Sequence, residues 1–185
     1  DVLFTDGENR DLTLNYTHIN TLEGVKLYRE AYAELEWRDF EDWIIQVGGQ
    51  YLEYNQELYQ IKPEAPLFRA ITPFTEITRR ITDKKSIRGE AQYMHTRQDF
   101  GSWLYGLIEY NIISGVNRWS FAVSDMYLLK PAPETSPVKT KEHFYNFFVA
   151  YTKGPHRFTA QYVRQVEGIN CTGGVCRYEP AFSGA

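Results

Sequence analysis

The side chains that could carry out catalysis in this sequence are few and scattered. His95 is followed two positions later by Arg97, where a histidine–serine hydrolytic pair on one strand would need its nucleophile. Glu34 and Glu36 share one face of an alternating segment, a geometry compatible with an acid and base pair. Charged strand faces produce such carboxylate pairs routinely, so we expect these two to be structural. The sequence therefore predicts that the protein is not an enzyme.

Metal and cofactor chemistry is equally sparse. The sequence contains no phosphate-binding glycine loop, dinucleotide fingerprint, nucleophile elbow or zinc-protease motif. The histidines do not have the spacing of metal ligands; they are His18, His95, His143 and His156. We expect no metal ion and no cofactor.

The two cysteines, Cys171 and Cys176, lie five positions apart around the residues 172–175. No other cysteine and no nearby histidine is present to complete a metal site with them. We expect a disulfide between them, which would imply an oxidising compartment outside the cytosol. Two free thiols are the alternative.

Length, charge and composition set broad limits. The 185 residues suffice for one domain or for part of a larger barrel, and the net charge of −4 gives no reason to expect nucleic acid. Aromatic residues make up 16% of the chain, with 14 Tyr and 11 Phe, which fits pleated, interface-lying surfaces better than helices. No apolar run reaches the roughly 18–20 residues of a transmembrane helix. Because the chain opens at Asp1, we expect a mature protein or a fragment.

The clearest structural signal is period-two alternation in 142–153 and 156–167, joined by a tight turn at 153–155. Tyr145 and Phe147 lie on one face of the first segment, and Asn146 and Phe148 lie on the other. Alternation over ten or more residues is longer than a soluble strand needs, and it matches a tilted strand that crosses a bilayer. These residues predict a transmembrane hairpin.

The same alternation recurs along the chain and predicts about ten strands. A helix is possible for 27–38, because Glu, Ala and Leu are helix formers, but strict alternation favours a strand there. The predicted strands are 10–18, 27–38, 43–55, 71–82, 86–98, 102–113, 119–130, 142–153, 156–167 and 177–185.

The lengths of the connections alternate. Those after every second strand are short, namely 39–42, 83–85, 114–118 and 154–155, whereas the other set contains the long links 56–70 and 131–140 and the cysteine loop. Short turns at one end and long loops at the other are typical of outer-membrane barrels, with turns in the periplasm and loops outside. Four or five links of each kind could also sort this way by chance.

Alternation also assigns the two faces of these strands. We expect the polar face to line a lumen, filled with hydrated or paired side chains; its members are Glu30, Glu34, Glu36, Arg38, Gln46, Gln50, Arg88, Glu90, Gln92, Glu109, Asn111, Asn146 and Gln161. We expect the other face to contact lipid and to carry an aromatic belt of Trp37, Trp43, Trp119, Phe121, Tyr145, Phe147, Tyr151, Phe158 and Tyr162.

All four tryptophans, including Trp103, lie near predicted strand ends, where an interfacial belt would place them. In a soluble barrel the two faces would be exchanged, with the aromatic residues inside.

The segment 166–184, VEGINCTGGVCRYEPAFSG, resembles the C-terminal end of outer-membrane β-barrel proteins of the Bacteroidetes, in a family of uncharacterised function. This resemblance implies an external hairpin closed by the cysteines and followed by the last strand of the barrel. Members of such families are longer, so the chain would be a C-terminal portion. It departs from the usual pattern because it lacks a terminal aromatic residue, and the resemblance identifies no catalytic residue.

Together these observations predict one domain, 1–185, that is an all-β, antiparallel, up-and-down transmembrane β-barrel with about ten strands visible, complete or part of a larger barrel. We expect it in the bacterial outer membrane, as a pore or transport channel or as a membrane-embedded scaffold subunit of a larger complex. The expected partners are outer-membrane lipid and other surface proteins that contact the loops 56–70 and 131–140. The alternative is a soluble β-barrel that binds an apolar ligand in its interior.

Overall fold

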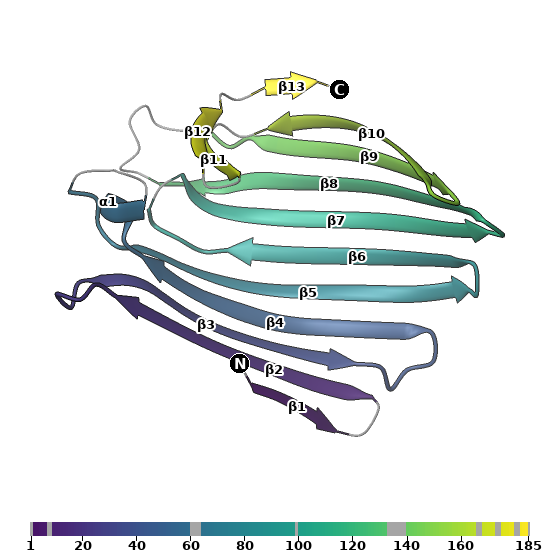
Figure 1. The fold of residues 1–185 in the computed structure, drawn as a ribbon, viewed down its shortest axis with the longest axis horizontal. Coiled ribbons are helices and arrows are strands. Elements are labelled where there is room, and N and C mark those ends of the chain that lie inside the picture. Colours follow the sequence, from purple (N-terminus) through teal and green to yellow (C-terminus); the bar gives the residue numbers. More distant parts are fainter. Residues whose placement is uncertain are drawn as a thin grey trace.

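The chain folds into one large antiparallel β-sheet and almost no helix (Figure 1). The computed structural model describes residues 2–6, 9–59, 64–98, 100–132, 140–165, 168–172, 175–179 and 182–184. Eleven strands form the main sheet in the order β1 to β10 and then β13: β1 (Val2–Asp6), β2 (Arg10–Asn20), β3 (Lys26–Trp37), β4 (Trp43–Tyr54), β5 (Phe68–Thr82), β6 (Lys85–Met94), β7 (Gly101–Ser114), β8 (Asn117–Pro131), β9 (His143–Lys153), β10 (His156–Gln165) and β13 (Phe182–Gly184). A short helix, α1 (Gln56–Tyr59), follows β4, and β11 (Gly168–Thr172) pairs with β12 (Val175–Glu179) in a separate hairpin.

The predicted fold class, an all-β antiparallel up-and-down sheet, is confirmed. Each of the first nine predicted strands overlaps one of β2 to β10. The prediction missed β1, and the predicted tenth strand, 177–185, is wrong as a single element. Its first residues belong to β12, and only Phe182–Gly184 returns to the main sheet beside β10.

The alternation of connection lengths is also present in the structure. The links 7–9, 38–42, 83–84, 115–116 and 154–155 lie at one end of the sheet, which we call the turn end, on the right of Figure 1. The links 21–25, 55–67, 95–100 and 132–142 lie at the opposite end, the loop end. The predicted loop 56–70 is shorter than expected, because it begins with α1 and β5 already starts at Phe68. Parts of both long loops, 60–63 and 133–139, lie outside the described residues.

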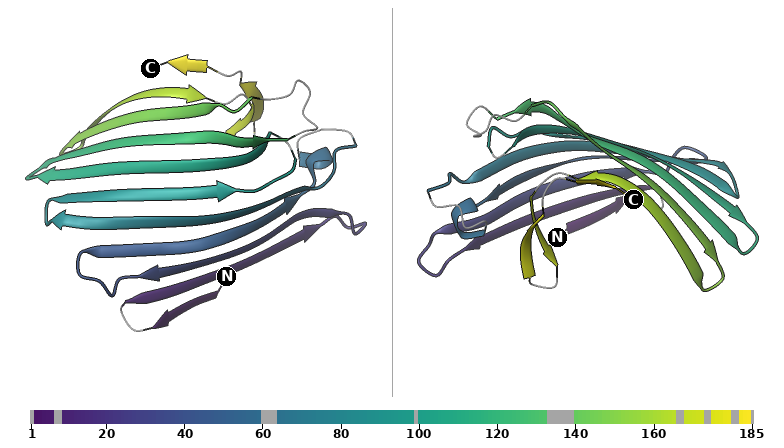
Figure 2. Two further views of the ribbon diagram at one scale, coloured as in Figure 1. Left: turned by 180° about the vertical axis from the view of Figure 1, so that it is seen from behind. Right: turned by 90° about the horizontal axis from the view of Figure 1, so that it is seen from above.

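The sheet is strongly curved, and the β11–β12 hairpin lies on its concave side near the loop end (Figure 2). The edge strands, β1 and β13, are not paired with each other among the described residues. The sheet is therefore open in this structure.

The register divides the side chains cleanly between the two faces, because residues directly opposite each other on neighbouring strands point the same way. The concave face is polar, and its side chains are shielded. The side chain of Glu109 is 21% exposed and that of Glu36 is 15% exposed. The convex face is apolar and open, with Ile108 at 62% and Phe158 at 64% exposure. The usual distribution of a water-soluble sheet is thus inverted.

A small apolar cluster covers the concave face at the loop end. Phe68 stacks on Tyr54 with ring centroids 4.7 Å apart, and Trp103 packs on Phe144 at 5.7 Å. Trp103 is only 8% exposed, so its predicted place in an interfacial belt is wrong. The reason is alternation itself, because Trp103 has the parity of Glu109 and therefore points to the concave side.

Gly48 allows two aromatic rings to cross the concave face. Tyr32 and Phe74 stack with centroids 5.7 Å apart, and Phe74 lies directly opposite Gly48 in the register. A Cβ atom at position 48 would lie 2.5 Å from Cζ of Phe74 and 2.5 Å from the carbonyl oxygen of Ala33. Only glycine fits under this pair of rings.

We predict that Gly48→Ala lowers the free energy of unfolding by about 1–3 kcal/mol, because the added methyl group overpacks the site. Gly49→Ala is the matched control, because its nearest atom would be the carbonyl oxygen of Thr72 at 3.9 Å. Chemical denaturation followed by tryptophan fluorescence measures both variants. Equal stability of the two would contradict the packing role assigned to Phe74.

Candidate functional site

The candidate site is the polar concave face, and the register brings all the predicted lumen residues to it. Twelve of them lie in strands with the same facing, and Arg38 follows β3 directly and contacts two of the carboxylates there. Sequence reasoning missed Asp11 and Glu76, although alternation within their own strands gives them the same facing. Whether this face lines a closed lumen stays a prediction.

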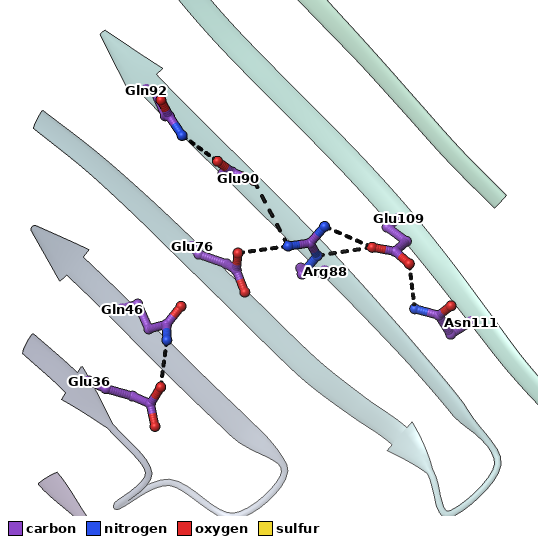
Figure 3. Close-up of polar contacts among 8 residues, drawn as sticks. All are labelled: Glu36, Gln46, Glu76, Arg88, Glu90, Gln92, Glu109 and Asn111. Atoms are coloured by element: carbon purple, nitrogen blue, oxygen red, sulfur yellow. Dashed lines mark hydrogen bonds and ion pairs between the residues drawn. The ribbon is translucent and has the colours of Figure 1, made fainter. Parts of the chain in front are cut away.

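Arg88 is the centre of the largest polar network (Figure 3). Its Nη1 lies 2.9 Å from a carboxylate oxygen of Glu76, and its Nη2 lies 2.9 Å from one of Glu109. Glu109 also accepts hydrogen bonds from Asn111 at 3.1 Å and from Ser120 at 2.9 Å. The network thus links four consecutive strands, β5 to β8, through their side chains.

A second group of contacts links β2, β3 and β4 on the same face. Gln46 donates to Glu36 at 2.5 Å, and Arg38 pairs with both Glu36 and Asp11. One turn of the pleat further along, Gln50 donates to Glu30 at 2.5 Å. The amide groups of the glutamines therefore act as donors to carboxylates that no arginine reaches.

The concave face carries an excess of negative charge. Two arginines, Arg38 and Arg88, share it with seven carboxylates, those of Asp11, Glu30, Glu34, Glu36, Glu76, Glu90 and Glu109. A cavity of about 290 Å³ opens between the two networks and is lined by Glu34, Glu76, Glu90 and glutamines. Such a surface attracts cations and repels anions.

The convex face carries all nine predicted belt residues. At the turn end, Trp119 packs on Tyr151 with ring centroids 4.4 Å apart, and Tyr151 stacks on Phe158 at 6.4 Å. At the loop end, Tyr145 stacks on Tyr162 at 6.2 Å. Aliphatic and small residues lie between these two aromatic groups, among them Leu35, Ile45, Val47, Ile77, Ala91, Ile108 and Val123. We call this surface the apolar band.

The loop-side limit of the apolar band shifts along the sheet. In β4 the first charged convex residue is Glu53, and in β8 it is Asp125. The register places Asp125 level with Val47, six residues before Glu53 (53 − 47), by way of Gly106, Ala91 and Thr75. The limit therefore moves by six residues over four strands.

The turn-side limit shifts in the same direction. Trp37 in β3 is level with Ile45, whereas Trp119 in β8 lies two residues beyond Phe121, which is level with Trp43. This shift is four residues over five strands. A shift of about one residue per strand corresponds to strands inclined by roughly 35° to the normal of the band, close to the tilt of strands in closed barrels.

Glu53 lies just outside the apolar band, at the loop end, and is 2% exposed. It is held by Lys26 Nζ at 2.7 Å, Arg69 Nε at 2.7 Å and the hydroxyl of Tyr51 at 3.0 Å. The hydrogen bond from Lys26, with smaller contributions from Tyr51 and Arg69, lowers the pKa of the Glu53 carboxyl to about 2 despite its burial. Glu53 is therefore a fixed anion that orders the cations around it.

The catalytic candidates do not assemble into an active site. Glu34 accepts a hydrogen bond from the Tyr32 hydroxyl, and Glu36 is held by Gln46 and Arg38. Among the described residues, no group of three or more histidine, cysteine or acidic side chains could hold a metal ion. That the chain is not an enzyme stays a prediction.

One pair that sequence reasoning missed is Ser102 and His95, whose Oγ and Nδ1 atoms lie 3.3 Å apart. Ser102 is 1% exposed and donates its hydroxyl hydrogen to the carbonyl of Thr96 at 3.0 Å. The same oxygen accepts from the Thr96 backbone amide at 3.2 Å. These bonds fold the link between β6 and β7, so Ser102 is a structural residue, and no local motif could have announced the contact.

Two further expectations concern parts of the chain with partial description. The register places Cys171 directly opposite Cys176 in the β11–β12 hairpin, a backbone arrangement that suits a disulfide. Their side chains lie outside the described residues, so the bond stays a prediction. No helix among the described segments is both long and apolar enough to cross a membrane.

We predict that Arg88→Gln lowers the free energy of unfolding by about 1–3 kcal/mol, because it leaves three carboxylates close together without their cation. The double variant Arg88→Gln/Glu109→Gln should regain part of that loss, since it removes one of the uncompensated charges. Arg118→Gln is the control, because Arg118 is exposed on the same face and forms no ion pair among the described residues. Denaturant midpoints of the four proteins decide the matter, and an unchanged midpoint for Arg88→Gln would show that the network is not stabilising.

Comparison with known proteins gives one result. No curated protein and no solved structure matches the chain. A family model described as a family of unknown function, DUF6029, matches residues 5–185. The chain therefore belongs to the DUF6029 family of proteins of unknown function.

Proposed function

We propose that this chain forms a β-barrel in the bacterial outer membrane, with the apolar band against lipid and the polar concave face toward a lumen. The observation that carries the proposal is the inverted exposure of the two faces. A row of exposed aromatic and aliphatic side chains on the convex side costs free energy in water and gains it in hydrocarbon. Carboxylates and arginines on the shielded side are satisfied by one another and by water.

The dimensions of the apolar band support this proposal. In β4 the band runs from Trp43 to Tyr51, eight residue steps, or roughly 27 Å at about 3.4 Å per residue. Inclined by roughly 35°, such a strand covers about 22 Å, close to the apolar band of about 25 Å on outer-membrane barrels. Aromatic residues lie at both of its limits, as in interfacial belts.

The excess of carboxylates on the concave face favours a role as a pore or transport channel with a preference for cations. A membrane-embedded scaffold subunit of a larger complex is the other form of the proposal, in which paired side chains fill the lumen. In either form the sheet closes by pairing its edge strands with each other or with further strands. The resemblance of segment 166–184 to outer-membrane proteins of the Bacteroidetes adds the expected compartment, with the turn end in the periplasm and the loop end outside.

One observation favours the alternative, a soluble barrel with an apolar ligand. A groove of about 700 Å³ lies across β2 to β5 and is lined largely by apolar residues of the convex face, including Leu14, Ala31, Ala33 and Ile71. For this groove to lie inside a soluble barrel, the sheet would have to curve in the opposite direction. We therefore assign the groove to contact with lipid chains.

We expect the purified chain to fold only in detergent or lipid, because only then is the convex face out of water. Folding is read from the β-type circular dichroism spectrum and from a shift in gel migration on boiling. A folded, soluble monomer without detergent would exclude the membrane barrel and favour the soluble alternative. For the inserted protein, planar-bilayer conductance that favours K⁺ over Cl⁻ would support the pore, and its absence the scaffold.

The assignment of faces can be tested with two adjacent residues of β7. We predict that Ile108→Lys reduces the folding free energy into phosphatidylcholine liposomes by about 2–4 kcal/mol, as expected for a lysine in the middle of a bilayer. Leu107→Lys is the matched control and should be tolerated, because Leu107 is directly opposite Glu90 on the concave face. Urea titration of the inserted variants measures both, and a larger loss for Leu107→Lys would reverse the two faces.

A further inference from the structure

Four cations gather on the convex side at the loop end, just beyond the apolar band. We call this group the cation patch, formed by Lys26, Arg29, Arg69 and Arg97. The register places Arg29, Glu53 and Arg69 directly beside one another on three consecutive strands. Arg97 follows the short bridge between Ile71 and His95 and lines the same groove as Arg69.

The charges of the cation patch are not balanced. Glu53 is its one carboxylate, and Lys26 and Arg69 already share it. Arg29 and Arg97 form no ion pair among the described residues, and the Nε of Arg29 is buried without a hydrogen-bond partner. Two guanidinium groups are therefore held in place and left available to an external anion.

The groove beside the patch has the shape that a lipid headgroup requires. Its volume is about 420 Å³; one side is lined by Arg69, His95, Arg97 and Gln98, and the other by Tyr51, Ala70 and Ile71. Tyr51 and Ile71 belong to the convex face, so the groove is continuous with the apolar band. Cationic and amide donors thus lie next to a surface suited to acyl chains.

The turn end of the same face does not offer such a site. Arg10 forms an ion pair with Asp39, and the guanidinium of Arg79 lies over the ring of Trp43, 4.9 Å from its centroid. These cations are engaged within the protein. The available positive charge on the convex face is therefore concentrated at the loop end.

We propose that the cation patch binds the phosphate group of a lipid headgroup in the outer leaflet, with the acyl chains of that lipid lying along the apolar band. This inference rests on the proposed membrane insertion. Guanidinium groups bind phosphate through paired hydrogen bonds, and the exclusion of water by the neighbouring acyl chains strengthens those contacts. A phosphorylated glycolipid fits this site better than a zwitterionic phospholipid, since the patch has three more cations than anions.

The test uses the purified chain in a neutral detergent, titrated with diphosphoryl lipid A and followed by native mass spectrometry. We expect Arg29→Gln/Arg97→Gln to bind this lipid at least tenfold more weakly than the wild type, and Arg97→Gln alone to give a smaller loss. Neither substitution removes a partner of Glu53, so both variants should keep heat-modifiable migration. Arg79→Gln, on the same face at the turn end, should bind like the wild type.

Three outcomes would overturn the inference. Equal lipid binding by the double variant would show that the patch is not the site, and equal binding of phosphatidylcholine would show that the phosphate charge is not recognised. Full competition by millimolar inorganic phosphate would indicate a site for a free anion. A chain that inserts into bilayers but shows any of these results leaves the proposed function intact, whereas a chain that never inserts overturns both proposals.

Discussion

The arrangement of this protein depends on one constraint, the unbroken register of its neighbouring strands. Since side chains alternate with a period of two, a slip of one residue in any pair would send carboxylates to the convex face and aromatic rings to the concave face. The register shifts lie at Ile19, Arg80 and Ser102, each close to a strand end. The central parts of the strands are thereby kept in step, and the apolar band continues across the sheet.

The register also explains why the polar face is stable. Arg88 can reach carboxylates on both neighbouring strands only because Glu76 and Glu109 lie within one residue of its level. The networks tie the sheet together from inside, where shielded polar groups need partners. Gly48 contributes in a different way, by leaving room for Phe74 to lie flat across the strands. Charge pairing and ring packing thus fix the same strands.

Much of the fold and of both faces could be predicted from the sequence, because alternation over ten or more residues is a strong local signal. The unpredicted features depend on distant partners or short segments. β1 has only five residues, too few for its pattern to stand out, and β11 and β12 pair with each other rather than with the main sheet. The contacts of Glu53 with Lys26 and Arg69, and of Ser102 with His95, join residues from different strands that no spacing rule connects. Pro73 lies in the middle of β5 and not near its start, and the printed ladder to β6 is interrupted there, between Ile71 and Phe74.

The sequential topology has a consequence for how the chain folds. Each strand from β1 to β10 pairs with the strand that precedes it, so the contacts are predominantly those of hairpins. A low contact order of this kind allows the sheet to grow hairpin by hairpin with little loop-closure entropy at each step. The edges at β1 and β13 are the exception, since any pairing between them joins the two ends of the chain. The slow and error-prone step is therefore concentrated at these edges, where exposed backbone groups would also accept a strand from another chain.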